Sequence, residues 1–145
     1  MATQYAVPDE GLEELLFRVT KALLVTPEPL ELRLFVNDVL PIRGTTLATY
    51  TEATFPGYSR RTIEAADWSL LPIGPDHIAR AALTAGPFAY TPGLTDEVVY
   101  GVYLVNLSGS FVQFQRRFDV PLVPVSGVQF RVSPVVTARS ESYEV

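Results

Sequence analysis

The chain has 145 residues, of which 48% are hydrophobic and 19% charged. This length and composition suit one globular domain with its own core and exclude a disordered chain. Its net charge is −5, and its 11 basic residues are scattered, so we expect no nucleic-acid partner. The absence of cysteine excludes disulfides and thiolate zinc sites.

The first predicted element is an amphipathic helix over about residues 10–24. Its leucines and valine recur at three- and four-residue steps, Asp9 can cap its N-terminus, and Pro27 ends it. The apolar stripe packs either on its own domain or on a neighbouring subunit. We take it as the candidate interface, which consists of Leu12, Leu15, Leu16, Val19 and Leu23.

From Leu30 the apolar period changes to two. Leu30–Val36 is predicted as a half-buried strand, with its leucines on one face and Glu31 and Arg33 on the other. Pro56-Gly57 predicts a type II turn in which the glycine takes a positive φ. Further extended segments are predicted at Arg60–Leu70, His77–Leu83 and Pro87–Thr91.

The C-terminal half carries the strongest β pattern. Val98–Val105 is β-branched and aromatic throughout, as in a strand buried on both faces, and it is predicted to form a hairpin with Val112–Phe118 through a turn at Asn106–Gly109. Pro121 and Pro124 then mark a crossing loop, and Val128–Ser133 is predicted as the last strand.

Together these patterns predict six to eight short strands with turns every 8–12 residues. The expected fold is mainly β, an antiparallel β-sandwich of jelly-roll or immunoglobulin-like type with one N-terminal amphipathic helix. The expected organisation is an N-terminal arm and helix at 1–29, a sandwich domain at 30–138 and a polar tail at 139–145.

No catalytic, cofactor or metal site is predicted. His77 is the single histidine, and its neighbour Asp76 would point to the opposite face of a strand. The acidic pair Asp96–Glu97 lacks the spacing of a calcium loop. Trp68 is a candidate platform for a sugar, although strand aromatics mostly pack in cores. We also expect no membrane partner, because the N-terminus lacks a signal-peptide pattern and every apolar run is too short to span a bilayer.

The box Thr-Glu-Ala-Thr-Phe-Pro-Gly-Tyr at residues 51–58 resembles one found in a family of small virion proteins of tailed bacteriophages. The family often has Gly-Asp before its last strand, where this chain has Ser126-Gly127-Val128, and Leu70–Thr91 has no counterpart. The other matching segments follow in the family's order and span most of residues 7–137: Val7–Asp9, Leu32–Asn37, Tyr100–Tyr103, Arg117–Pro121 and Val128–Pro134.

This resemblance implies a non-enzymatic virion structural protein, made in a host cytoplasm. The leading expectation is a capsid cement (decoration) protein that binds the major capsid protein or other virion proteins as a homo-oligomer, most simply a trimer. The alternative is a tail, baseplate or fibre component that acts as adaptor or receptor-binding tip. A polysaccharide hydrolase is the third hypothesis, for which no catalytic set is visible in the sequence.

Overall fold

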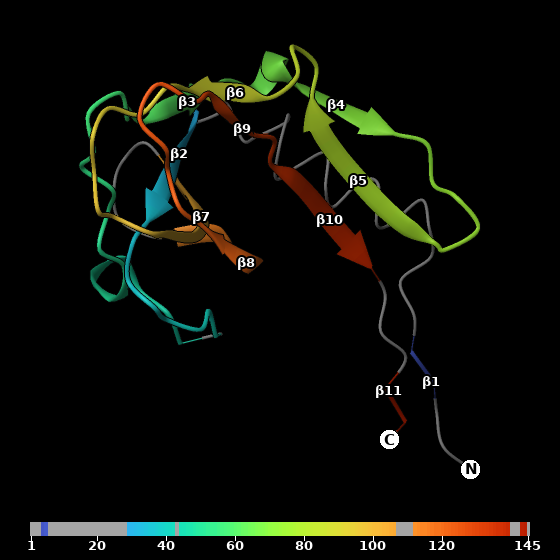
Figure 1. The fold of residues 1–145 in the computed structure, drawn as a ribbon. Helices are drawn as coiled ribbons and strands as arrows, with labels where there is room; N and C mark the ends of the chain where they lie inside the picture. Colours follow the sequence, from blue (N-terminus) through green and yellow to red (C-terminus); the bar gives the residue numbers. More distant parts are fainter. Residues whose placement is uncertain (1–3, 6–28, 43, 107–111, 140–142, 145) are drawn as a thin grey trace. The chain divides into compact units, whose positions relative to one another are not determined.

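The described part of the chain is mainly β. The computed structural model describes residues 4–5, 29–42, 44–106, 112–139 and 143–144 (Figure 1). Within these ranges there is no α-helix, and all strand pairs are antiparallel. The predicted mainly β, antiparallel class is therefore confirmed, whereas the predicted helix over 10–24 lies outside the described residues.

The chain divides into two compact units. Unit 1 consists of residues 1–27, 65–86 and 133–145, and unit 2 consists of residues 28–64 and 87–132. The body predicted at 30–138 is thus distributed over both units. The sandwich itself stays a prediction, as do the arm at 1–29 and the tail at 139–145.

Unit 1 is built around a three-stranded sheet in the order β10-β5-β4. These strands are β4 (Trp68–Leu71), β5 (Ile78–Leu83) and β10 (Val135–Arg139), and the short helix η2 (Ala65–Asp67) precedes β4. Separately, β1 (Gln4–Tyr5) pairs with β11 (Tyr143–Glu144). The predicted strand at His77–Leu83 is confirmed by β5.

Unit 2 holds a four-stranded sheet in the order β3-β2-β7-β8 and a two-stranded ribbon, β6-β9. The sheet contains β2 (Leu30–Phe35), β3 (Arg61–Ile63), β7 (Val99–Asn106) and β8 (Val112–Leu122). The ribbon contains β6 (Phe88–Tyr90) and β9 (Phe130–Val132), and η1 (Leu47–Thr49) is a short 3-10 helix. The predicted strand near Leu30 and the predicted hairpin of β7 with β8 are confirmed.

Both faces of the four-stranded sheet are buried at its centre. Leu32 and Leu34 of β2 are 0% exposed and pair with Leu104 and Val102 of β7, which gives an aliphatic face. On the other face Phe35 joins an aromatic cluster with Tyr50, Tyr103 and Val105. The Tyr50 and Tyr103 rings stack with centroids 4.5 Å apart. The burial of β7 on both faces, predicted from its continuous apolar sequence, is confirmed.

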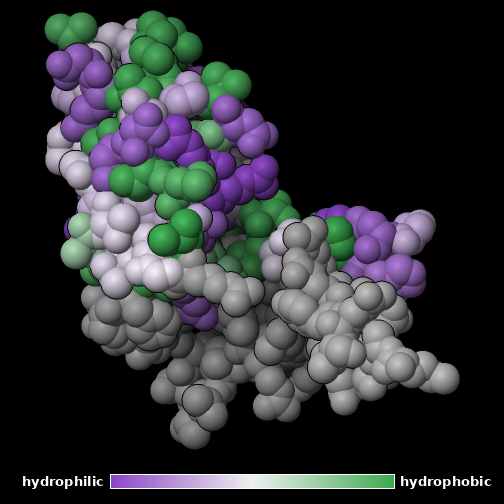
Figure 2. All heavy atoms as spheres, turned by 90° about the horizontal axis from the view of Figure 1, so that it is seen from below, coloured by the Kyte–Doolittle hydropathy of each residue, from purple (hydrophilic) through white to green (hydrophobic). Residues whose placement is uncertain are grey.

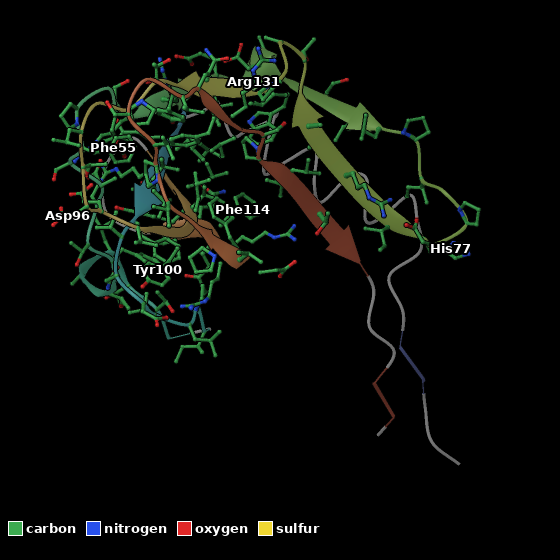
Figure 3. The ribbon with its side chains drawn as sticks, in the orientation of Figure 1. Phe55, His77, Asp96, Tyr100, Phe114 and Arg131 are labelled. Atoms are coloured by element: carbon green, nitrogen blue, oxygen red, sulfur yellow. The ribbon has the colours of Figure 1, made fainter. Side chains whose placement is uncertain are left out.

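A second aromatic cluster joins the loops of unit 2 to its ribbon. Tyr90 of β6 stacks on Tyr58 at 6.0 Å and on Phe130 of β9 at 5.4 Å, and Phe55 packs against Tyr58 and Phe130. Phe55 points into the interior of the unit (Figure 3). Such ring contacts add about 0.5–1.5 kcal/mol each beyond the burial of apolar area.

The single strand predicted at Arg60–Leu70 is wrong. β3 ends at Ile63, η2 turns the chain at Ala65–Asp67, and β4 begins at Trp68. β3 pairs with β2, whereas β4 pairs with β5, so the two halves belong to different sheets. The buried residues Ile63 and Trp68 are five positions apart, so the alternation changes phase where η2 interrupts the strand.

Three further expectations also fail. A loop was predicted at Pro121, but β8 continues through this residue. The register of β8 with β7 shifts between Gly101 and Val99. At such an irregularity the strand can contain a proline, which has no amide hydrogen to donate to the neighbouring strand. The strand predicted at Val128–Ser133 is not the last, since β10 follows and pairs with β5. The described residues contain eleven strands, more than the six to eight expected.

We predict that Gly101→Ala destabilises unit 2. A Cβ at this position would lie 2.2 Å from the carbonyl oxygen of Arg116 and 2.6 Å from the Phe35 ring. Overpacking of this kind costs roughly 2–3 kcal/mol, measured as the free energy of unfolding in urea. Gly44→Ala is the control, because a Cβ on Gly44 would meet no atom within 4 Å, and it should change stability by less than about 0.5 kcal/mol. Equal effects of the two substitutions would contradict this packing.

Candidate functional site

The predicted interface residues Leu12, Leu15, Leu16, Val19 and Leu23 all lie outside the described residues. Trp68, in contrast, lies at the start of β4 and is 1% exposed. Its indole face is therefore not available to a sugar, which rules out the less favoured of the two interpretations of Trp68. The favoured interpretation, a core residue of a strand, is confirmed.

Asp76 and His77, which the sequence analysis considered for catalysis, lie together in the turn before β5. Asp76 forms an ion pair with Arg80 and accepts a hydrogen bond from the Ile78 amide. His77 lies in an exposed turn between β4 and β5 with a φ of 52° (Figure 3). Within the described ranges there is no group of three or more His, Asp or Glu placed to hold a metal ion. The same part of the chain contains no helix with the length and hydropathy of a membrane span.

The Thr51–Tyr58 box covers the edge of β2 that faces away from β7. Val36 donates its amide to the Thr51 carbonyl at 2.9 Å, and Ala53 donates to the Leu34 carbonyl at 3.0 Å. β3 covers only the first half of the same edge, at Leu30–Leu32. The box therefore completes the hydrogen bonding of a buried strand, which would otherwise leave unpaired backbone groups.

Glu97 fixes the middle of the box. Its carboxylate accepts hydrogen bonds from the amide of Thr54 at 2.9 Å, from the amide of Phe55 at 3.0 Å and from the Thr54 hydroxyl at 2.5 Å. These bonds tie the loop before β7 to the box across more than forty residues of sequence. Charge-assisted bonds of this kind are about twice as strong as neutral ones.

The predicted type II turn ends the box. Tyr58 donates its amide to the Phe55 carbonyl at 3.0 Å, and Gly57 has a φ of +88°, so this prediction is confirmed. A Cβ on Gly57 would lie 2.1 Å from the Thr91 carbonyl oxygen, and Gly93 donates its amide to the Pro56 carbonyl at 2.7 Å. The turn is thus packed directly on the Thr91–Gly93 backbone.

Four charged side chains link the box to β2, on the face of the strand that carries Glu31 and Arg33. Arg60 donates two hydrogen bonds of 2.8 Å to the Glu52 carboxylate, and Tyr58 donates its hydroxyl to the same group at 2.8 Å. On β2, Arg33 donates to Glu31 at 2.7 Å, and Glu31 lies 3.5 Å from Arg60. The two carboxylates and two guanidinium groups balance in charge, so the network is complete in itself and stabilises the fold.

These contacts shift the ionisation of the network. Burial alone raises the pKa of Glu52, but hydrogen bonds from Arg60 and Tyr58 and the charges of Arg60 and Arg33 outweigh it and hold this pKa below its ordinary value. Burial, followed by the bond to Glu52, raises the pKa of Tyr58 far above its usual range. Glu52 therefore stays ionised and Tyr58 protonated at neutral pH.

The candidate functional surface consists of exposed apolar side chains on unit 2, each more than half exposed. The first group, here called the valine patch, lies on residues 120–128 and the neighbouring loop and consists of Leu94, Val120, Val123, Val125 and Val128. The second, here called the leucine patch, consists of Leu40 and Ile42. Figure 2 shows hydrophobic side chains reaching the surface among hydrophilic ones on one face of the described residues. Exposed apolar groups are candidates for a contact surface where they lie together.

The sequence holds a signal for the valine patch that periodicity does not reveal. No charged residue occurs from Val120 to Phe130, in a chain in which 19% of residues are charged. Periodicity predicts a loop and a strand for this segment, and loops are normally polar. An uncharged, proline-containing loop is the pattern that indicates an apolar contact surface.

Comparisons of the chain with models of protein families, with curated proteins and with solved structures find no significant match.

We predict that Glu97→Ala lowers the free energy of unfolding by roughly 2–3 kcal/mol, because the amide of the buried Phe55 loses its acceptor. Asp96→Ala is the control, since Asp96 is the neighbouring carboxylate and is exposed at the rim of unit 2 (Figure 3). Urea unfolding followed by tyrosine fluorescence measures both. A loss of the same size in both variants would mean that the clamp on the box contributes nothing specific.

We predict that Glu52 makes stability depend on acid pH. Because its folded pKa lies below the ordinary value of 4.5, its contribution is complete above that value and is lost as pH falls through the folded pKa. Glu52→Gln should be less stable than wild type at neutral pH and should lose less stability on acidification. Urea midpoints measured from neutral pH to below the folded pKa test this. Parallel pH curves for the two proteins would contradict it.

Proposed function

We propose that this protein is a non-enzymatic structural component of a bacteriophage virion, a capsid cement (decoration) protein that stabilises the head shell. It binds the major capsid protein or other virion proteins, acts as a homo-oligomer, most simply a trimer, and is located in the virion after synthesis in the host cytoplasm. Its β body is proposed to be a sandwich of jelly-roll or immunoglobulin-like type.

The observation that carries this proposal is the exposed apolar surface of unit 2. Seven large apolar side chains there are more than half exposed, and Leu94 reaches 88%. Apolar side chains of this size supply most of the free energy of permanent protein contacts, about 25 cal/mol per Å² buried.

The loops that present these side chains are fixed to the core, which also supports a binding role. Gly127 donates its amide to the Pro92 carbonyl at 2.8 Å, and Val128 donates to the Val125 carbonyl at 2.9 Å. Pro92 and Pro124 are buried. A surface that is already ordered loses little conformational entropy on binding, so more of the contact energy appears as affinity.

The sequence resemblance supports the virion assignment, and the box that carries it lies along the edge of β2 in unit 2. The structural role of Thr51–Tyr58 in closing the edge of β2 gives a physical reason for such a box in proteins of this fold. The proposed sandwich is supported by an antiparallel four-stranded sheet and a ribbon that are in contact, since Arg61 of β3 donates a hydrogen bond to the Ala89 carbonyl of β6 and lies over the Tyr90 ring.

The location is tested by gold-labelled antibody staining of intact phage particles from a lysate of the source. We expect label distributed over the heads. Label confined to the tail end would replace the cement assignment by the alternative, a tail, baseplate or fibre component. Absence of label from all particles would overturn the virion assignment. Particles of a strain that lacks the gene serve as the staining control.

The candidate interface of the N-terminal segment is tested separately. We predict that Leu15→Asp with Leu16→Asp abolishes binding to particles that lack the protein, because the apolar stripe is removed. Glu13→Gln with Glu14→Gln changes the same segment without touching the stripe and should bind as wild type does. Unfolding curves check that both variants remain folded. Unchanged particle binding and oligomer size in the aspartate variant would show that the stripe is not the contact.

A further inference from the structure

The chain passes from one unit to the other several times. Within the described residues it does so at 64–65, 86–87 and 132–133, and a further passage at 27–28 lies outside them. Every strand pair in the described part of the chain belongs to a single unit. The three described passages therefore connect the units by backbone alone and not by a sheet that both units share.

On the unit 1 side, the three passages begin next to one another. Thr84, which follows β5, donates its amide to the carbonyl of Asp67, the residue before β4, at 2.8 Å. Ala82 of β5 lies opposite Val135 of β10 in the antiparallel pair. The segments that leave unit 1 after β5 and before β4 and β10 are thus direct neighbours.

On the unit 2 side, the same three segments are again neighbours. Phe88 of β6 lies opposite Val132 of β9, and Arg61 of β3 donates a hydrogen bond to the Ala89 carbonyl of β6 at 2.9 Å. β6 continues β5, β9 leads into β10, and β3 leads into β4 (Figure 1). All three connections therefore cross between the units at the same position along neighbouring strands.

Strand pairing is interrupted where the segments cross. The pair Ala82–Val135 belongs to unit 1 and the next pair, Phe88–Val132, belongs to unit 2, so residues 83–87 stand opposite residues 133–134 alone. Pro87 follows Gly86 on one side of this break, and Pro134 stands on the other. Because a proline has no amide hydrogen, neither residue can donate to a ladder that would bridge the break.

The third passage is interrupted at the same place. β3 ends at Ile63 in the sheet with β2, and β4 begins at Trp68 in the sheet with β5. The short helix η2 at Ala65–Asp67 separates them, so no strand runs through this passage either.

The backbone at the break has room to change conformation. Gly86 has a φ of +82°, and a Cβ on it would meet no atom within 4 Å. Ala85, Pro87 and Ser133 are exposed. Segments with exposed backbone and little packing around them are the ones that bend at the lowest cost in free energy.

We propose that residues 64–65, 84–87 and 133–134 form a hinge about which unit 1 moves relative to unit 2. Breaks that lie side by side permit such a motion through changes of φ and ψ in a few residues, whereas breaks at different positions along the strands would oppose one another. Each unit keeps its own hydrogen-bonded sheet as the hinge moves. The protein then presents two ordered surfaces whose mutual angle adjusts to what they bind.

Spin labels test the hinge directly, because the chain contains no cysteine and takes a label only where a cysteine is introduced. Ala48→Cys in η1 of unit 2 and Thr137→Cys in β10 of unit 1 label exposed positions on different units. Ala48→Cys with Ser126→Cys labels two exposed positions of unit 2 and is the matched control.

Pulsed electron paramagnetic resonance of the full chain measures the distribution of distances between the two labels. Labelled chains are diluted with unlabelled ones, so that only distances within one chain contribute. Thermal unfolding confirms that each variant is folded. We expect the distribution between the units to be at least about twice as wide as the distribution within unit 2.

A change in the hinge itself should alter the distribution between the units. Pro87→Gly should widen it further, because Pro87 restricts its own φ and the conformation of Gly86 before it. Pro75→Gly is the control, since Pro75 is also exposed but lies in the turn between β4 and β5, inside unit 1. This control should leave the distribution unchanged.

Two results would overturn the hinge: a distribution between the units as narrow as that within unit 2, or a Pro87→Gly effect no larger than that of Pro75→Gly. Neither result depends on where the protein is found. Absence of the protein from phage particles would overturn the virion assignment, and the label distances would still decide the hinge.

Discussion

The constraint on which unit 2 depends is the hydrogen bonding of the outer edge of β2. This strand is buried and pairs with β7 along its whole length, yet β3 covers only Leu30–Leu32 on its other side. The remaining backbone groups must find partners, since an unpaired buried group costs about 1–3 kcal/mol. The Thr51–Tyr58 box supplies them, and Glu97 and the Arg60–Glu52 pair hold the box in place.

This arrangement gives the polar groups of the box a structural explanation and leaves the surface for function. The carboxylates of Glu52 and Glu97 use their oxygens for hydrogen bonds within the unit, so they are not available as an acid–base pair. What remains is an ordered surface with uncharged apolar loops. This surface is the part of unit 2 that the proposed role in a particle would use.

The spacing of apolar residues along the chain correctly predicted β2, β7 and the hairpin of β7 with β8. The alternation at Leu30–Leu34 and the continuous apolar run of β7 reflect burial directly, so both strands were correct. The same reasoning joined β3 to β4, because alternation does not reveal which strand pairs with which. The expectation that strand aromatics pack in the core was correct for Trp68, which is buried. The predicted interface at Leu12–Leu23 stays a prediction.

The sequence by itself determined the mainly β class, the type II turn at Pro56-Gly57 and the β7–β8 hairpin, because these depend on local conformational preference and on burial pattern. Only the tertiary structure decided that the division into two units runs between β3 and β4, that β10 pairs with β5, and that the box closes the edge of β2. These are relations between residues far apart in the chain, and local preference carries no information about which distant partner satisfies a hydrogen bond or covers an apolar side chain.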